Sequence, residues 1–286
     1  MYLARSRQRA GAVQPVIGVA EGDDVRWYSL AGLTDTVDAT ALSADFQTRA
    51  RAALAAGELA EVDAPTDFAP PLARIGKIVC IGLNYRDHAE ETGATPPAEP
   101  ILFMKAPDTV VGPTDEVLIP RASVKTDYEV ELAVVIGATA RYLDDPAAAD
   151  EVIAGYAISN DVSEREFQIE RGGQWDKGKN SETFNPFGPW IATADEVGDP
   201  QALGLRLWVN GELRQDGNTK NMIFGVRHLV WYLSQFMTLY PGDVINTGTP
   251  AGVAMGRPGS GYLRAGDVVE LEIDGLGRQR QVFGQA

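Results

Sequence analysis

The sequence predicts a β-rich α+β fold, with a small N-terminal α/β domain followed by a larger domain built mostly of strands. Its 30 glycines and 17 prolines favour many turns, and therefore short strands joined by irregular connections. A chain of 286 residues is long enough for two such domains and can bury a substantial core. The proline-rich stretch 63–71 has little hydrophobic periodicity, so we interpret it as the linker between domains 1–70 and 71–286.

The N-terminal domain is expected to contain two strands and one helix. Val16–Ala20 and Val25–Leu30 flank a polar turn, which predicts two neighbouring strands. Ala41–Leu59 is rich in alanine and includes Leu42 and Phe46 among its apolar positions, which predicts a helix. These elements give the small domain its α/β character.

The larger domain carries clear hairpin signals and one long helical pattern. Asn210-Gly211 separates Leu205–Val209 from Glu212–Arg214, as expected for a two-residue hairpin turn. Asp274-Gly275 marks another turn after Val268–Ile273. A helix is expected over Ile223–Thr238. Its predicted core contacts are Phe224, Leu229, Trp231, Leu233 and Phe236.

The charge and the cysteine content exclude several classes of function. With 25 basic and 40 acidic residues the net charge is −15, which repels nucleic acids and anionic membranes. Cys80 is the single cysteine, so no intrachain disulfide can form, and we expect a packed thiol in a buried strand. No apolar run could span a bilayer, and the N-terminus does not resemble a signal peptide. We therefore expect a cytoplasmic protein with no nucleic-acid or membrane partner.

One of the two histidines comes paired with a carboxylate at helical spacing. His88 and Glu91 lie three residues apart, so on a helix they share one face. A carboxylate beside an imidazole holds its tautomer and supports its basicity, so the pair could take a proton from water. The alternative is a structural or surface pair. The other histidine, His228, lies in the predicted helix and is interpreted as structural.

An acidic strand offers a candidate metal site. Along 126–136 the residues alternate, so Glu129 and Glu131 point to the same side. The simplest interpretation places the apolar residues in the core and both glutamates in water. Alternatively, two carboxylates on one face would hold a hard cation such as magnesium, manganese or calcium, with Asp161 as a third ligand. The sequence has no cysteine cluster and no histidine pair, which disfavours a structural zinc site.

Two further segments could bind an anion. Residues 171–189 are glycine-rich and irregular, which is typical of a lid or binding loop, and contain Lys177 and Lys179. A lysine there is either a solvated charge or a group that binds a carboxylate or a developing oxyanion. The segment 246–252 is predicted to be a tight turn whose hydroxyls and amides could hold an anion, or an ordinary turn.

Taken in order, these segments resemble the fumarylacetoacetate hydrolase family. Their sequences are most similar to those of bacterial members that act on 2,4-diketo-3-deoxy sugar acids or acylpyruvates. The resemblance covers essentially the whole larger domain. It implies the mixed β-roll or sandwich of the family's C-terminal type, and it implies a homodimer. The matching phrases are GLNYRDHAEE (82–91), PILFMKAPDTVVGP (100–113), DYEVELAVVIG (127–137), GYAISNDVSEREFQ (155–168), GGQWDKGKNSETFNPFGP (172–189) and PGDVINTGTPAGV (241–253).

The resemblance also implies a site. It implies a divalent cation, magnesium or manganese, on Glu129, Glu131 and Asp161. It implies that His88 and Glu91 form a dyad that activates water. These residues would form the catalytic centre of a metal-dependent enzyme.

Other residues would contact the substrate. The resemblance implies Lys179 as a polar stabiliser, and Arg165, Gln168 and Thr249 as contacts for the acid end of the substrate. The sequence departs from the family wording at Glu182, where many relatives have aspartate, which leaves the substrate subclass open.

The function implied is hydrolysis of the C3–C4 bond of a 2,4-diketo acid, which gives pyruvate and a second carboxylic acid. The partner is then a small keto acid. Three alternatives use the same pocket: decarboxylation of oxaloacetate or a related β-keto acid, lyase action on ureidoglycolate, and non-catalytic binding.

Overall fold

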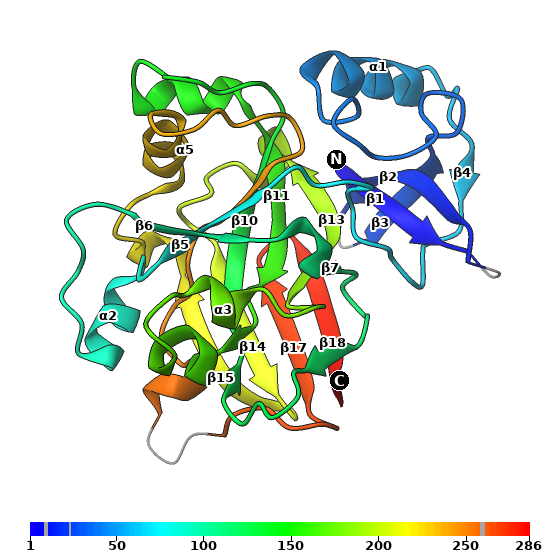
Figure 1. Ribbon diagram of the computed structural model, residues 1–286. Coiled ribbons are helices and arrows are strands. Elements are labelled where there is room, and N and C mark those ends of the chain that lie inside the picture. The colour runs from blue at the N-terminus through cyan, green and yellow to red at the C-terminus, as the bar shows by residue number, and fades with distance from the viewer. Residues whose placement is uncertain (9–10, 23, 258–260) are drawn as a thin grey trace.

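The computed structural model describes residues 1–8, 11–22, 24–257 and 261–286. Two mixed sheets dominate it (Figure 1), which confirms the β-rich α+β fold. Within the described residues, no helix is long and apolar enough to cross a membrane.

The larger sheet collects strands from both ends of the chain. Most pairs are antiparallel, while β16–β5 and β13–β7 are parallel, so the sheet is mixed. In spatial order its strands are β4 (Glu61–Val62), β3 (Asp24–Ser29), β2 (Val13–Glu21), β1 (Tyr2–Arg7), β13 (Asn185–Thr193), β11 (Ile153–Asn160), β10 (Val130–Ile136), β16 (Val244–Asn246), β5 (Ile78–Gly82) and β6 (Ile101–Lys105), with β7 (Val110–Val111) beside β13.

The second sheet lies below the first in the view of Figure 1. Its strands are β15 (Glu212–Asn218), β14 (Gly204–Val209), β17 (Val268–Ile273), β18 (Gly277–Gln285) and β8 (Val117–Ile119). A separate two-stranded ribbon pairs β9 (Thr126–Asp127) with β12 (Ser163–Glu164).

Helices are few and short. The α-helices are α1 (Ala44–Ala55), α2 (Arg86–Thr92), α3 (Asp176–Lys179), α4 (Ala194–Val197) and α5 (Val226–Ser234). Tighter or wider helical turns are η1 (Pro107–Thr109), η2 (Pro146–Glu151), η3 (Glu166–Glu170), η4 (Thr219–Asn221) and η5 (Ala254–Gly256).

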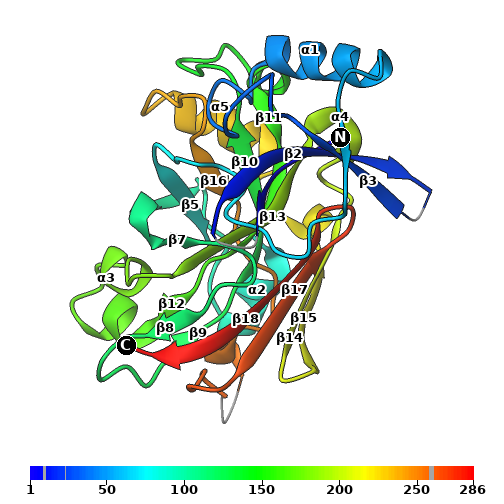
Figure 2. The same ribbon diagram turned by 90° about the vertical axis from the view of Figure 1, so that its right-hand side faces the viewer.

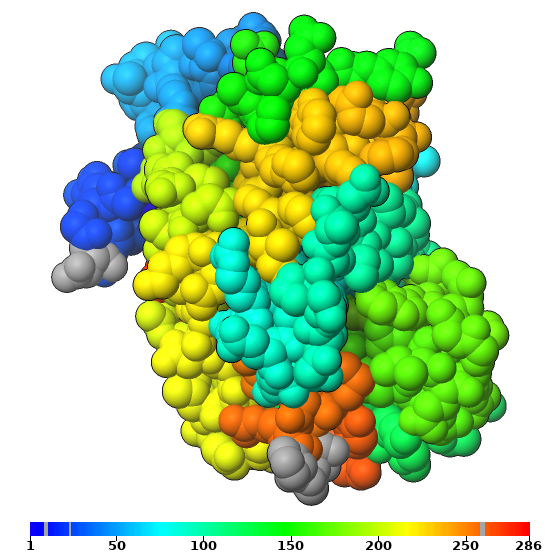
Figure 3. All heavy atoms as spheres, turned by 90° about the vertical axis from the view of Figure 1, so that its left-hand side faces the viewer, coloured from blue at the N-terminus to red at the C-terminus, as the bar shows by residue number. Residues whose placement is uncertain are grey.

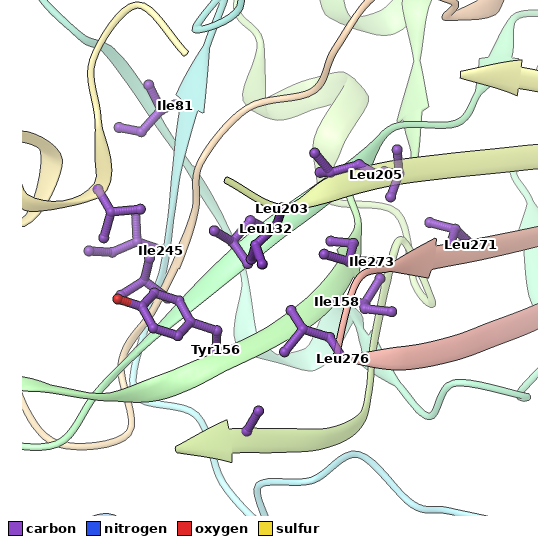
Figure 4. Close-up of a cluster of buried hydrophobic side chains, with 14 of the residues drawn as sticks. Ile81, Leu132, Tyr156, Ile158, Leu203, Leu205, Ile245, Leu271, Ile273 and Leu276 are labelled. Atoms are coloured by element: carbon purple, nitrogen blue, oxygen red, sulfur yellow. The ribbon is translucent and has the colours of Figure 1, made fainter. Parts of the chain in front are cut away.

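The two sheets share an apolar core. Leu132 on β10 and Ile158 on β11 approach side chains of β14 and β17, including Leu205 and Leu271 (Figure 4). All four are fully buried, and each such side chain contributes roughly 1.5–3 kcal/mol to folding. This core holds the ends of β10 and β11 in place, and these ends carry the acidic residues of the predicted site.

The N-terminal strands continue the larger sheet. Strand β1 pairs antiparallel with β13, with Tyr2 opposite Ala192, so the sheet crosses the predicted boundary at residue 70 (Figure 2). The stretch 63–71 is packed, because Phe68 bridges to Ser6 and its ring contacts Trp27. The stretch therefore packs against the N-terminal strands, and the linker with its division into 1–70 and 71–286 stays a prediction.

Both long helices are shorter than predicted. Helix α1 begins only after Ser43, whose hydroxyl accepts a hydrogen bond from the Phe46 amide at 3.2 Å. Helix α5 begins after residues 223 and 224, whose amides are bonded to the backbone and side-chain oxygens of Asn84. Phe236 lies beyond the end of α5 and is 63% exposed, so its prediction as a core contact is wrong.

The predicted strand 126–136 is interrupted. The Asp127 carboxylate accepts a hydrogen bond from the Tyr128 amide at 2.8 Å. Strand β9 ends at Asp127, and β10 begins at Val130. Two other predictions hold. Asn210-Gly211 forms the turn between β14 and β15, and Cys80 is buried in β5.

Candidate active site

Three acidic side chains converge at the end of the strand pair β10–β11. Glu131 lies on β10, Glu129 precedes it, and Asp161 follows β11. The Asp161 amide donates to the Glu129 carbonyl at 3.0 Å, which brings the two side chains to one place. Each residue offers a carboxylate oxygen, and these oxygens lie within 4.8 Å of one another and are buried. The interpretation of the glutamates as facing water is therefore wrong.

Cationic side chains surround this carboxylate cluster of Glu129, Glu131 and Asp161. The Lys179 ammonium donates to Glu129 and to Asp161, both at 2.8 Å. The Arg165 guanidinium donates to Glu129 at 2.6 Å. Lys179 and Arg165 are almost fully buried, so these bonds are shielded from solvent.

The electrostatics of the cluster suit a divalent cation. Although burial raises the pKa of Glu129, the charges of Lys179 and Arg165 outweigh it and hold that pKa well below its usual range. Glu131 is different, because burial together with the charges of Asp161 and Glu129 raises its pKa well above the ordinary value. A cation among the three carboxylates would relieve this repulsion, and an all-oxygen donor set fits magnesium or manganese.

Helix α2 carries the predicted dyad. His88 Nδ1 lies 3.5 Å from Glu91 Oε2, and the imidazole is buried. If Nδ1 donates to Glu91, the free lone pair is on Nε2. Asn84, just before the helix, donates to the carbonyl of Thr247 at 2.8 Å and so fixes the start of α2 against the segment that follows β16.

Glu91 is itself held by the backbone. The Gly252 amide lies 3.0 Å from both of its carboxylate oxygens. Burial raises the pKa of Glu91, but the hydrogen bonds from His88 and the Gly252 amide outweigh it, so the pKa is lowered. Glu91 is therefore ionised at neutral pH and can stabilise a protonated His88.

A cavity of about 220 Å³ joins these groups. The segments that contribute to it, around α2, around η3 and α3, and at η5, meet on the face shown in Figure 3. Glu91 lies behind His88 and is not part of the lining. The other predicted site residues all line the cavity, namely His88, Glu129, Glu131, Asp161, Arg165, Gln168, Lys179 and Thr249.

The predicted substrate contacts are mostly engaged within the protein. Arg165 donates to Gln168 Oε1 at 3.0 Å in addition to its bond with Glu129. The Thr249 hydroxyl donates to the Val130 carbonyl at 3.0 Å. Their position in the lining agrees with the prediction, while their role in binding stays a prediction.

Close packing positions Lys179. Helix α3 lies against η3 and β12, and a Cβ on Gly178 would meet the Glu164 carbonyl at 2.4 Å. Lys177 points elsewhere and donates to the Arg171 carbonyl at 2.8 Å. Of the two lysines in the predicted loop, therefore, only Lys179 reaches the carboxylate cluster.

Sequence reasoning missed two buried charged residues. The Lys105 ammonium donates to Asp161 at 2.6 Å, and Asp127 accepts from Arg165 Nε at 2.8 Å and from the Ala254 amide at 2.8 Å. The available signal was a lysine two residues after the apolar Phe103, on the same face of a strand. We assigned no function to this lysine, although it lies within the phrase at 100–113.

Replacing Lys105 by methionine is expected to destabilise the metal-free protein by about 3 kcal/mol, since breaking a buried ion pair costs roughly 3–5 kcal/mol and Lys179 still pairs with Asp161. Urea denaturation would measure the change. Lys220→Met is the matched control, because Lys220 is exposed on η4. Equal stability of the two variants would contradict a structural role for the Lys105–Asp161 pair.

Replacing Gly252 by alanine is expected to disturb the dyad. Gly252 has φ +110°, and an added Cβ would lie 2.0 Å from the Arg214 carbonyl, so the amide that holds Glu91 must move. Gly32→Ala is the control, because Gly32 has φ +102° and nothing within 4 Å. The control should lose about 1–2 kcal/mol from backbone strain alone, and Gly252→Ala should lose more.

For this pair of variants, urea denaturation gives the stability and kcat reports the dyad. A Gly252→Ala protein with the stability and the kcat of the Gly32→Ala protein would contradict the contact. Gly252 and Gly32 both have a positive φ, so both variants suffer similar backbone strain. Any additional loss of stability in Gly252→Ala therefore measures the clash with the Arg214 carbonyl.

A larger hollow of about 710 Å³ lies elsewhere, between η2, α4 and α5. His228 lines it, and its ring stacks on Phe224 at 5.4 Å and on Tyr232 at 6.1 Å. The hollow does not contain the carboxylate cluster, which lines the smaller cavity. This placement agrees with a structural role for His228.

The two mixed sheets and the cavity define a β-rich enzyme class with a buried carboxylate cluster beside a His–Glu pair. The model of the fumarylacetoacetate hydrolase C-terminal family matches residues 77–283. The chain therefore belongs to the fumarylacetoacetate hydrolase family.

Individual relatives include hydrolases and isomerases. A protein of Burkholderia multivorans, provisionally named a hydrolase, is 57% identical over 74% of this chain and 75% of its own length. The structure of maleylpyruvate hydrolase from Sphingobium sp. SYK-6 with manganese(II) and pyruvate covers 100% of both chains, at 31% identity and TM-score 0.78. That of 5-carboxymethyl-2-hydroxymuconate delta-isomerase from Mycobacterium smegmatis covers 100% of this chain and 99% of its own, at 31% identity and TM-score 0.77.

Proposed function

We propose that the protein is a metal-dependent hydrolase that cleaves the C3–C4 bond of a 2,4-diketo acid to pyruvate and a carboxylic acid. The observation that carries the proposal is the meeting of the imidazole of His88 with the carboxylate cluster in one cavity. His88 would supply the base that activates water, and the carboxylate cluster would hold a hard cation. The similar maleylpyruvate hydrolase structure, with its manganese ion and pyruvate, supports this reading of the site.

Glu129, Glu131 and Asp161 would hold the ion. When bound, a magnesium or manganese ion would supply Lewis-acid chemistry for the oxygens of a 2-keto acid and for developing enolate charge. The protein groups would do the rest of the work.

His88 would act as the general base. With Nδ1 donating to Glu91, Nε2 would be free to take a proton from a water molecule in the cavity. The resulting hydroxide adds to the C4 carbonyl, and the C3–C4 bond then breaks. The bonding electron pair leaves with C3 as the enolate of pyruvate, and a proton on C3 completes the product. One water is consumed, and its oxygen ends in the second carboxylic acid.

Lys179 would stabilise negative charge during these steps. Its ammonium is buried, and although burial lowers its pKa, the charges of Asp161 and Glu129 outweigh this and raise it. Lys179 is therefore protonated throughout, and it acts as a fixed positive charge rather than as a base. Arg165, Gln168 and Thr249 line the same cavity and are proposed to orient the acid end of the substrate.

A coupled pyruvate assay tests the proposal. The panel contains acylpyruvates, 2,4-diketo-3-deoxy sugar acids and oxaloacetate, each with Mg²⁺ or Mn²⁺ and with a chelator. Lyase action on ureidoglycolate is followed separately, by release of urea and glyoxylate. The expected result is metal-dependent release of pyruvate from a diketo acid, together with one equivalent of the second acid. Absence of pyruvate from every diketo acid in the presence of metal would overturn the proposal.

Isomerisation of an unsaturated 2-hydroxy acid is a second candidate, because a similar solved structure carries the name of such an isomerase. An isomerase would change the ultraviolet spectrum of its substrate without releasing pyruvate. We also expect the homodimer and the cytoplasmic location that the sequence suggested. Sedimentation and cell fractionation would test these two expectations.

A further inference from the structure

Part of the cavity lining is an apolar wall that begins beside Lys179. Phe103 and Ile101 come from β6, Leu83 from the segment after β5, Trp175 from the residue before α3 and Ile169 from η3. These segments are distant in sequence, so the wall is a product of the fold. It is the part of the cavity that the proposed chemistry leaves unused.

The wall is built close to the reacting groups. The indole ring of Trp175 packs directly against Gly82 of β5. A Cβ at position 82 would lie 2.3 Å from this ring, so the close contact requires glycine. Phe103 meets Trp175 edge to face with a centroid separation of 5.5 Å. The Lys179 ammonium lies 4.9 Å from the centroid of Phe103. A substrate whose head reaches Lys179 would therefore place its tail against these two rings.

The rim of the same cavity is apolar as well. Ile101 is 36% exposed and Ile169 is 47% exposed, and both line the cavity. A single exposed apolar side chain needs no explanation. Two at one rim, continuous with an apolar wall, indicate a surface that is covered when a ligand binds.

Polar groups for a tail are few among the described lining residues. Outside the predicted site residues, the polar groups in the lining are the hydroxyl of Thr92, which donates to the His88 carbonyl at 2.9 Å, and the indole N–H of Trp175. The cations are Arg165 and Lys179, and both are bonded to buried carboxylates. A carboxylate or a polyhydroxylated tail would lose several hydrogen bonds to water and find at most the one donor of Trp175 in the wall, which is unfavourable.

We infer that the substrate is an acylpyruvate whose acyl tail is short, uncharged and apolar; this inference rests on the proposed function and names its substrate class. The cavity of about 220 Å³ is smaller than the roughly 300–1,000 Å³ of common ligand pockets, which limits the length of the tail. Tails with a terminal carboxylate and polyhydroxylated sugar-acid tails are excluded by the same wall.

Three substrates that share the pyruvyl head test the inference. 4-Methylpentanoylpyruvate ends in an isopropyl group, and succinylpyruvate ends in a carboxylate of the same shape. A third diketo acid carries a dihydroxylated tail. With Mg²⁺ present, kcat/KM for the isopropyl compound is expected to exceed that for succinylpyruvate by about 100-fold or more, and that for the hydroxylated compound by about 10-fold.

Two neighbouring residues of β6 give a matched pair of variants. Ile101→Ser should lower the ratio of kcat/KM for 4-methylpentanoylpyruvate to kcat/KM for succinylpyruvate by about 10-fold. Leu102→Ser is the control, because Leu102 is 38% exposed, is next in sequence and does not line the cavity. It should behave like the unmodified protein with every substrate.

A third variant tests the charge argument directly. Ile169→Lys adds a cation at the rim and should raise kcat/KM for succinylpyruvate by about 10-fold. Because Ile169 is half exposed, this change is expected to leave the fold intact.

The outcomes separate the inference from the proposed function. Cleavage of succinylpyruvate at least as efficient as that of the isopropyl compound would overturn the inference and leave the hydrolase proposal standing. If no diketo acid is cleaved, the proposed function fails. Calorimetric titration of the same two compounds with Mg²⁺ then decides the inference separately: tighter binding of the isopropyl compound supports it, and equal or weaker binding overturns it.

Discussion

Replacing His88 by alanine is expected to lower the hydrolysis rate of a 2,4-diketo acid by about 10²–10⁴-fold, the range typical for loss of a general acid–base group. The imidazole lines the cavity, and its Nδ1 lies 3.5 Å from Glu91, so the substitution removes the proposed base for water. The rate of pyruvate release at saturating metal measures the effect.

The other histidine provides the control. His228 packs on Phe224 and Tyr232 beside a different hollow, so His228→Ala should retain the hydrolysis rate of the unmodified protein. Oxaloacetate separates the two chemistries, because its decarboxylation needs no water and should survive in part in His88→Ala. Full hydrolysis by His88→Ala would show that the dyad does not activate water.

Replacing Glu131 by glutamine is expected to weaken the binding of Mg²⁺ or Mn²⁺ by more than about 100-fold, since loss of even an outer-shell partner costs roughly 10–100-fold. Hydrolysis should fall with it. The raised pKa of Glu131, caused by burial and by the charges of Asp161 and Glu129, gives a second expectation. The amide removes this repulsion and still accepts from the Gly248 amide, so the metal-free variant should be at least as stable as the unmodified protein.

Thermal denaturation with and without metal separates these effects. A ligand that binds the folded state raises the midpoint in proportion to RT ln(1 + [L]/Kd), so the metal-dependent rise should disappear in Glu131→Gln. Glu182→Gln is the matched control, because Glu182 is exposed and lies outside the cavity lining. An undiminished metal-dependent rise in Glu131→Gln would contradict the proposed ligand set.

Sequence patterns predicted those elements whose structure depends on neighbouring residues. The Asn210-Gly211 turn and the buried strand at Cys80 were predicted from neighbouring residues alone. The helix ends were not, because the capping hydroxyl of Ser43 and the hydrogen bonds that the backbone and side-chain oxygens of Asn84 accept compete with apolar periodicity. The alternation of residues along 126–136 predicted that Glu129 and Glu131 share one face. It could not show whether that face is buried or exposed to solvent.

The roles of the buried lysines show the same limit. Lys179 was one of two lysines in an irregular segment. The family resemblance singled it out, but residue patterns did not, and the packing of α3 at Gly178 is what separates it physically from Lys177. Lys105 follows Phe103 on one face of a strand, but this local signal could not identify its partner Asp161, which is 56 residues away. A salt bridge of this kind depends on strand order, which residue periodicity does not encode.

By itself the sequence determined the β-rich character, the chemistry available and the family, because residue types and their order are read directly from the chain. The tertiary structure decided which charges meet. Strand β11 pairs with β10, and the register of that pair puts Asp161 beside Glu129, while α2 and α3 close over them. In the folded protein these charged residues are buried, and a buried charge is unfavourable unless it has a partner. This constraint does not exist in the unfolded chain.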